Sequence, residues 1–185
     1  MKIIDITREL LSAEVYPGDT PPTLTPAARA EEGGFNTSDL NCCVHNGTHI
    51  DAPRHVENGG ASASEIPLEK CFGPCRVITA DGRIRVKDLK AAAAAGVKKV
   101  LIRNARIGVL AAIGAALLKL DLIGTEEQSI GDERVHKLLL RSGLVVLEGL
   151  DLSNAEDGDY ILSALPLKID GADGTPVRAV LIKGK

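Results

Sequence analysis

Apolar and polar residues alternate near both ends of this 185-residue chain, whereas its middle combines short apolar runs with helical spacing. Alternation around Ile4 and Ile6 predicts a first strand over residues 2–7. Other extended or apolar runs, bounded by turn residues, predict further strands. These lie at Leu24–Arg29, Thr37–Val44, Cys75–Ala80, Lys99–Arg103, Leu144–Glu148, Tyr160–Leu167 and Val177–Ile182.

Three helices are expected in the middle of the chain. The first covers Val86–Ala95 and ends at Gly96, and the second covers Leu110–Leu120. Asp132 can cap a third helix that runs to Ser142. Helices thus alternate with strands in the middle, while strands predominate at both ends. The pattern predicts an α/β fold with a mixed sheet and not a doubly wound Rossmann domain.

Segments rich in proline, glycine and polar residues predict loops at Tyr16–Pro22, Glu57–Ser64 and Asp170–Pro176. No internal repeat and no linker divides the chain, so we expect one domain over residues 1–185.

Composition restricts the possible partners. Hydrophobic residues make up 44% of the chain and the net charge is −3, with no basic cluster. We therefore expect a globular protein that binds neither nucleic acid nor anionic membrane. There is no run of 18 apolar residues, and Asp5, Arg8 and Glu9 interrupt the N-terminal segment. Neither a transmembrane helix nor a secretory signal is expected, which predicts a cytoplasmic location.

The four cysteines match neither a CxxC pair nor a disulfide framework, and free thiols in a cytosolic protein are the expected state. They are Cys42, Cys43, Cys71 and Cys75. A zinc–thiolate role for the first two is a weaker alternative. Aromatic residues are few and tryptophan is absent, so this chain alone cannot line a pocket with many rings.

The densest chemistry lies in residues 45–55, which hold three of the four histidines and an aspartate. Imidazole and carboxylate groups are the usual protein ligands of zinc, manganese and iron. His45, His49 and Asp51 share parity, so on an extended strand their side chains leave from one face. Gly47 lies on the same face and leaves space for an ion. The spacing therefore predicts a metal site on a strand.

A helix would also bring the first two histidines together, but Asn46, Gly47 and Thr48 are poor helix residues. Pro53 then ends the regular strand. His55 need not share the ligand face and is a candidate for a different role. The simpler interpretation of the whole run is a surface strand with scattered polar residues.

Two further residues can complete such a site. His136 is the remaining histidine, and Glu148 interrupts an apolar strand. A buried carboxylate is costly unless it is paired or binds a cation, which favours Glu148 as a ligand. The alternatives are a histidine on a helix surface and a strand-end carboxylate in water.

The run HNGTHIDAPRH resembles the H-x-G-T-H-x-D-x-P-x-H signature of the cyclase family of metal-dependent hydrolases, which includes bacterial kynurenine formamidases and isatin hydrolases. Segments before and after it are also similar to that family and occur in the same order. They are IIDITREL, VYPGDTPP, VHKLLLRSGLVVLEGLDLS and DGDYILSALPLKIDGADGTPVRAVLI.

This resemblance implies a compact swivelling β/β/α domain with a mixed sheet. It also implies a set of metal ligands in which Asp51 can bridge two ions, and a histidine, His55, that transfers protons. The implied ligands are His45, His49, Asp51, His136 and Glu148. One or two divalent ions are implied, zinc first and manganese as the alternative. The implied assembly is a homodimer or homotetramer whose subunits shape one another's pockets.

One segment departs from the family pattern. Residues 105–109 are a short connection where formamidase-like relatives carry a longer, aromatic-bearing loop over the substrate. Tyr16 is then the best aryl contact, unless it packs within its own loop. Arg54 can meet an anionic substrate, or can simply be a solvated charge.

We therefore expect a metal-dependent hydrolase of C–N amide bonds acting on a small-molecule amide. Its reaction is that of an arylformamidase, converting N-formylkynurenine to kynurenine and formate, or of a related cyclic amide or imide hydrolase. The alternatives are a non-catalytic metal- or small-ligand-binding module on the same fold and thiol redox chemistry at Cys71 and Cys75. No nucleotide-binding glycine motif and no G-x-S-x-G motif is present.

Overall fold

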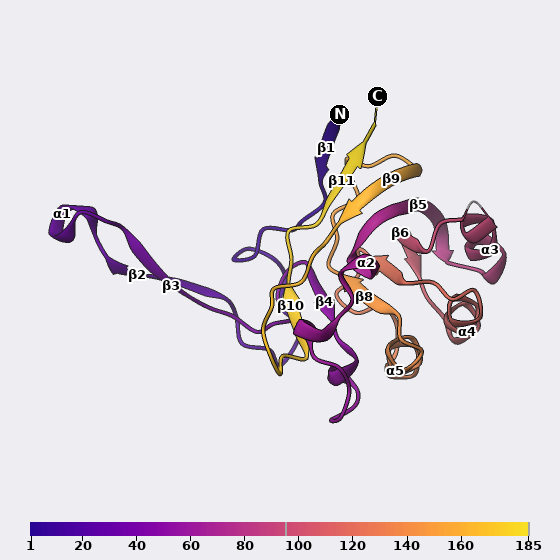
Figure 1. Cartoon of the computed structure of the whole chain (residues 1–185), viewed down its shortest axis with the longest axis horizontal. Coiled ribbons are helices and arrows are strands. Elements are labelled where there is room, and N and C mark those ends of the chain that lie inside the picture. The colour runs from indigo at the N-terminus through magenta and orange to yellow at the C-terminus, as the bar shows by residue number, and fades with distance from the viewer. Residues whose placement is uncertain (95, 185) are drawn as a thin grey trace.

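The computed structural model describes residues 1–94 and 96–184. Within them, nine strands form one sheet and two more form a separate hairpin, and three helices cover one face of the large sheet (Figure 1). The α/β fold expected from the sequence is confirmed. The strands are β1 Lys2–Asp5, β2 Thr23–Ala28, β3 Thr37–Asn41, β4 His49–Asp51, β5 Phe72–Arg83, β6 Lys99–Arg106, β7 Leu122–Thr125, β8 Val145–Glu148, β9 Gly158–Ser163, β10 Gly174–Pro176 and β11 Val180–Lys183.

The α-helices are α1 Ala30–Gly33, α2 Leu68–Cys71, α3 Val86–Ala94, α4 Val109–Leu117 and α5 Glu133–Arg141, and short 3₁₀ helices cover Pro53–His55 and Ala63–Glu65. The strand order of the large sheet is β1-β11-β9-β5-β6-β7-β8-β4-β10. Strands β5 to β8 are parallel and are joined through α3, α4 and α5. Antiparallel strands flank them on both sides, so the sheet is mixed and differs from a doubly wound Rossmann sheet.

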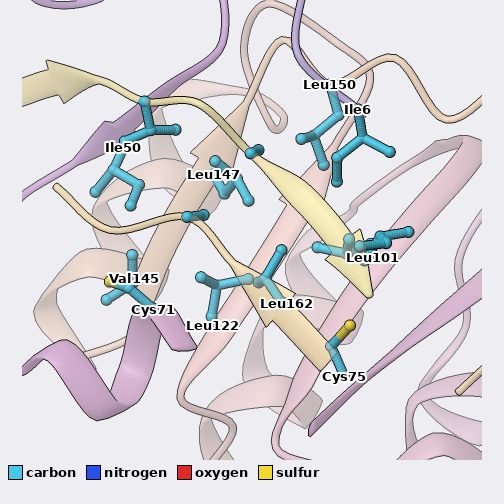
Figure 2. Close-up of a cluster of buried hydrophobic side chains, with 14 of the residues drawn as sticks. Ile6, Ile50, Cys71, Cys75, Leu101, Leu122, Val145, Leu147, Leu150 and Leu162 are labelled. Carbon is cyan, nitrogen blue, oxygen red and sulfur yellow. The ribbon is translucent and has the colours of Figure 1, made fainter. Parts of the chain in front are cut away.

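Apolar residues fill both sides of the sheet. On one side, Leu89, Ala112 and Leu139 of the three helices pack against Val100 and Ile123 of the strands. The other side forms a second apolar cluster, which Figure 2 shows with Ile50, Leu101, Leu122, Leu147 and Leu162 among its members. A bridge between Thr7 and Leu150 joins segments that follow β1 and β8, so the sheet curls around this cluster.

The pairing of β4 with β8 positions two polar residues on the helix-covered side. Ile50 belongs to the second apolar cluster, whereas Val146, which pairs with Asp51, belongs to the cluster beneath the helices. Because side chains alternate along a strand, His49 and Asp51 face the helices. His49 pairs directly with Glu148, which therefore points to the same side.

Most elements were predicted with boundaries shifted by a few residues. The helix predicted over Val86–Ala95 is α3, which the structure describes as far as Ala94. Ala95 lies outside the described residues. Two short strands were missed. Strand β7 is only four residues long and has little pattern of its own, and β10 lies in a segment predicted as a loop because glycine and proline surround it.

The predicted ligand strand over residues 45–51 is wrong in its first half. Strand β4 covers only His49–Asp51, and His45 lies in a preceding turn. Gly47 has φ of 63°, a left-handed conformation that breaks the extended backbone. A Cβ at Gly47 would meet Leu10 at 3.3 Å, so this glycine does not leave space for an ion between the histidines.

Strands β2 and β3, with α1 at their tip, form an arm that projects from the sheet (Figure 1). We call residues 23–41 the arm. Every residue in both of its strands is exposed. Among the described residues, no helix is long and apolar enough to cross a membrane.

Candidate metal centre

The centre of the site is a cross-strand pair. His49 of β4 and Glu148 of β8 occupy paired positions, and His49 Nε2 lies 3.3 Å from Glu148 Oε2 and 3.4 Å from Asp51 Oδ1. The three side chains are at most 4% exposed. The backbone N–H of Ile130 donates to Glu148 Oε1 at 2.7 Å, which holds that carboxylate in place. Two buried carboxylates therefore meet one imidazole.

His45 reaches the same carboxylate from the turn before β4. Its Nδ1 lies 2.8 Å from Asp51 Oδ1. The turn is held by two hydrogen bonds between Cys43 and Asn46: the Asn46 N–H donates to the Cys43 carbonyl, and the Cys43 N–H donates to Asn46 Oδ1. His45 therefore joins the site through a turn, although the parity argument placed it on a strand.

Helix α5 contributes His136. The side chain of Asp132 accepts the N–H of Val135 at 3.0 Å, which confirms the predicted cap of this helix. One turn later His136 faces the sheet, and its Nε2 lies 2.6 Å from Asp51 Oδ2. Asp51 thus contacts three histidines, with His45 and His49 nearest one oxygen and His136 nearest the other.

His55 lies in the 3₁₀ turn Pro53–His55 at the edge of this cluster. Its ring centroid is 4.2 Å from that of His45 and 5.3 Å from that of His136. Two groups have donor atoms all within 4.8 Å of one another: His49 with Asp51 and Glu148, and His45 with Asp51 and His55. The structure therefore brings all six predicted residues together, with Asp51 common to both groups.

Burial and histidine contacts act in opposite directions on the carboxylates. Burial alone would raise the pKa of Asp51, but the contacts with His136, His45 and His49 outweigh it and hold the pKa well below its usual range. For Glu148, burial and then the charge of Asp51 raise the pKa, and His49 opposes this only in part. Of the two buried carboxylates, Glu148 therefore has fewer neighbours that stabilise its negative charge.

The histidines show the complementary effect. Burial would lower the pKa of His49, yet Asp51 and Glu148 overcome it and raise the pKa to about 10. The pKa values of His45 and His136 are also raised, because the contacts with Asp51 outweigh burial. Without a metal, the buried carboxylates favour the protonated forms of His45, His49 and His136.

This donor set fits a divalent cation. Neutral imidazole nitrogens and carboxylate oxygens bind zinc, manganese and iron. A nearby positive charge would stabilise the buried carboxylates of Asp51 and Glu148, which are in close contact with these imidazoles. A cation supplies that charge and releases the protons that the imidazoles otherwise retain.

The cluster opens into a pocket of about 450 Å³, a volume suited to a small molecule. Tyr16, His55 and Lys137 are among its lining residues, whereas Arg54 is not. The expected role of Arg54 in substrate binding is therefore not supported.

Sequence reasoning missed Asp173, in the loop before β10. Its Oδ2 lies 2.9 Å from His45 Nε2 and 3.2 Å from His55 Nδ1. Burial would raise the pKa of Asp173, but the contacts with the two histidines lower it. The only signal in the sequence is an acidic residue in the turn segment DGADGTP, which is similar to many polar turns.

The family model Cyclase matches residues 4–157, which is most of the chain and includes the predicted ligands and His55. The chain belongs to the cyclase family. Two proteins named kynurenine formamidase are each 34% identical to it. The one from Salinibacter ruber aligns with 98% of this chain and 97% of its own length, and the one from Geobacillus thermodenitrificans with 97% of each.

Solved structures give the same picture of this cyclase-family fold. A protein described as a "Potential Metal-Dependent Hydrolase With Cyclase Activity" is 27% identical, with a TM-score of 0.81 over 97% of this chain and 96% of its own. An isatin hydrolase bound to the product analogue thioisatinate has a TM-score of 0.85 at 19% identity, over 100% of this chain and 93% of its own. The second likeness concerns the fold alone.

Proposed function

We propose that this protein is a metal-dependent hydrolase of C–N amide bonds, with an arylformamide such as N-formylkynurenine as its substrate. One observation carries the proposal: six residues with metal-ligand or proton-transfer chemistry line one pocket of a chain 34% identical to kynurenine formamidases. The products of that reaction are kynurenine and formate.

The proposed ligands are His45, His49, Asp51, His136 and Glu148. A divalent cation bound there would lower the pKa of water and polarise the substrate carbonyl. Asp51 directs its two oxygens at different histidines, which supports a bridging role between two ions. We propose zinc, with manganese as the alternative, because mixed imidazole and carboxylate donors suit both.

His55 is the proposed proton-transfer residue. It is the most exposed of the four histidine side chains at 33%, and it lines the pocket, so it can meet both water and substrate. Its imidazole takes up a proton from the attacking water and delivers it to the leaving nitrogen. Tyr16, at the pocket wall, offers one aromatic face to an aryl substrate.

The experiment is a hydrolysis panel of N-formylkynurenine, simple formamides, isatin, a lactam, an imide and a lactone, with metal content measured by elemental analysis. We expect formate release from N-formylkynurenine at the highest rate. Hydrolysis of isatin alone would instead favour a cyclic amide substrate. Metal binding with no turnover of any panel member would favour a non-catalytic binding module.

A His55→Gln variant tests the proton-transfer role. We expect it to keep its metal and to lose about 100-fold or more of its turnover. Arg54→Gln is the matched control, since the neighbouring side chain does not line the pocket. Loss of metal from His55→Gln would make His55 a ligand, as its proximity to His45 and Asp51 also permits.

We further propose that the protein assembles as a homodimer or homotetramer through the arm. A two-stranded hairpin has little stability alone in water, and this one exposes Leu24, Phe35 and Leu40. Sedimentation analysis should give two or four times the chain mass of 19.4 kDa. A Phe35→Ser, Leu40→Ser variant should shift towards monomer, whereas Leu117→Ser, also exposed but outside the arm, should not.

A further inference from the structure

Asp173 contacts both a proposed metal ligand and the proposed proton-transfer residue. Its Oδ2 is within hydrogen-bond distance of His45 Nε2, at 2.9 Å, and of His55 Nδ1, at 3.2 Å. His45 is a proposed metal ligand and His55 is the proposed proton-transfer residue. One carboxylate oxygen therefore contacts one residue from each function.

The backbone fixes the position of this carboxylate. The carbonyl of Asp173 accepts the N–H of Ala52 at 2.9 Å, and the next residue, Gly174, pairs with Asp51. A Cβ at Gly174 would lie 2.6 Å from Cε1 of His45. Only glycine lets the loop approach the imidazole this closely. The chain thus brings Asp173 against the histidines without using its side chain as a structural anchor.

The contacts also determine which ring nitrogens carry hydrogen. An ionised carboxylate only accepts, so each contacting ring nitrogen donates an N–H. Both ring nitrogens of His45 contact carboxylates, Nε2 that of Asp173 and Nδ1 that of Asp51 at 2.8 Å. When a cation replaces the hydrogen between Nδ1 and Asp51, the contact with Asp173 keeps the hydrogen on Nε2 and leaves Nδ1 as the metal-binding atom. His55 keeps Nε2 free to accept a proton. A carboxylate that orients a ligand histidine in this way is a common support of metal sites.

We propose that Asp173 is a positioning residue that holds His45 in its metal-binding tautomer and His55 in its proton-accepting tautomer. The part that concerns His55 rests on the proposed hydrolase function. The part that concerns His45 requires only that the cluster binds a metal.

The test compares Asp173→Ala with Asp170→Ala, which removes a carboxylate from the same loop that contacts Ser64 and no histidine. Zinc affinity is measured by chelator competition. The His55 tautomer is measured in metal-free protein from its ring ¹⁵N shifts at about pH 8, and kcat and KM are measured with N-formylkynurenine. Asp173→Asn, which keeps the side-chain volume, is the second variant if Asp173→Ala does not fold.

For Asp173→Ala we expect zinc affinity and kcat each to fall about 10–100-fold, with little change in KM. The Nδ1–H tautomer of His55 should lose population, while Asp170→Ala should match the wild type in every measurement. Wild-type tautomer, zinc affinity and kcat in a folded Asp173 variant would overturn the proposal. If the wild type hydrolyses no amide, the proposed function fails, but zinc affinity and the tautomer still decide the role of Asp173.

Discussion

Two sets of ionisable groups are almost completely buried in this protein, on opposite sides of the same sheet. Cys71 and Cys75 lie in the apolar cluster shown in Figure 2, and Asp51 and Glu148 lie beneath α5. Burial raises the pKa of each thiol to about 12, because Lys99 opposes it only weakly. Asp51 is equally buried, yet its pKa falls.

The two regions are equally buried, and they differ in the residues that contact the ionisable groups. The thiols have apolar neighbours and remain protonated, so they are inert packing groups. Asp51 has three imidazole neighbours that hold its pKa low, so its carboxylate stays charged and can bind a cation beside Glu148. This contrast argues against redox chemistry at the thiols, and four changes can break or sharpen it.

The largest effect is expected for Asp51→Asn. The change removes the charge that three histidines share, and we expect turnover to fall by at least about 100-fold, equivalent to about 3 kcal/mol of lost stabilisation. Metal affinity should fall with it. The measurements are initial rates and chelator competition, with the exposed Asp151→Asn as control. Normal metal content and a normal rate in Asp51→Asn would show that Asp51 is neither a metal ligand nor needed for turnover.

Glu148→Gln should lower metal affinity without lowering the free energy of unfolding. Its raised pKa shows that burial and the nearby Asp51 disfavour its negative charge. Glutamine removes that charge but keeps an oxygen to accept the N–H of Ile130. We expect loss of metal affinity, while the free energy of unfolding of metal-free protein, measured in urea, stays within about 1 kcal/mol or rises. A loss of several kcal/mol would mean that this carboxylate is structural.

Substitution of a buried thiol is expected to lower stability without affecting catalysis, the opposite of the result expected for Glu148→Gln. Cys75→Ser places a hydroxyl in an apolar cluster, which should destabilise the protein by about 1–3 kcal/mol and leave kcat unchanged. Cys42→Ser, at a partly exposed position, should cost little. The readouts are urea unfolding and initial rates. A catalytic defect without destabilisation would reopen the question of thiol chemistry.

The smallest expected effect is a loss of folding stability at alkaline pH, caused by the two buried thiols. The ordinary pKa of a thiol here is 9.0, and folding raises that of Cys71 and Cys75 to about 12. Between these values the folded chain binds more protons than the unfolded chain, so stability falls as pH rises above 9. Each thiol should contribute about 1 kcal/mol of this loss by pH 10. The Cys71→Ala, Cys75→Ala variant should lose less stability over the same range in urea unfolding; an identical pH dependence would contradict the prediction.

Local patterns predicted most of the elements and most of the residues that meet at the candidate site. The helical spacing and cap at Asp132 placed His136 on a helix, and the cost of a buried carboxylate singled out Glu148. His45 lies beside Asp51 as predicted, but it comes from a turn and not from a shared strand, because the left-handed Gly47 breaks the extended backbone.

What the sequence could not supply depends on pairing between distant segments. Asp173 reaches His45 only because β10 pairs with β4, and no local pattern marks that pairing. The arm was predicted as two extended segments, but their separation from the main sheet follows from the absence of a partner strand within the described residues. The substrate-binding role expected for Arg54 has no support from the residues that line the pocket and stays a prediction.

The position of β4 between β8 and β10 has a consequence for biosynthesis. During translation His45, His49 and Asp51 leave the ribosome first, Glu148 follows about a hundred residues later, and β10 follows Glu148. A nascent chain therefore carries only three of the five proposed metal donors until His136 and Glu148 are made. Ion capture by the complete proposed donor set is therefore expected only after Glu148 has emerged and β4 has paired with β8, and a series of arrested nascent chains would time this closure of the sheet.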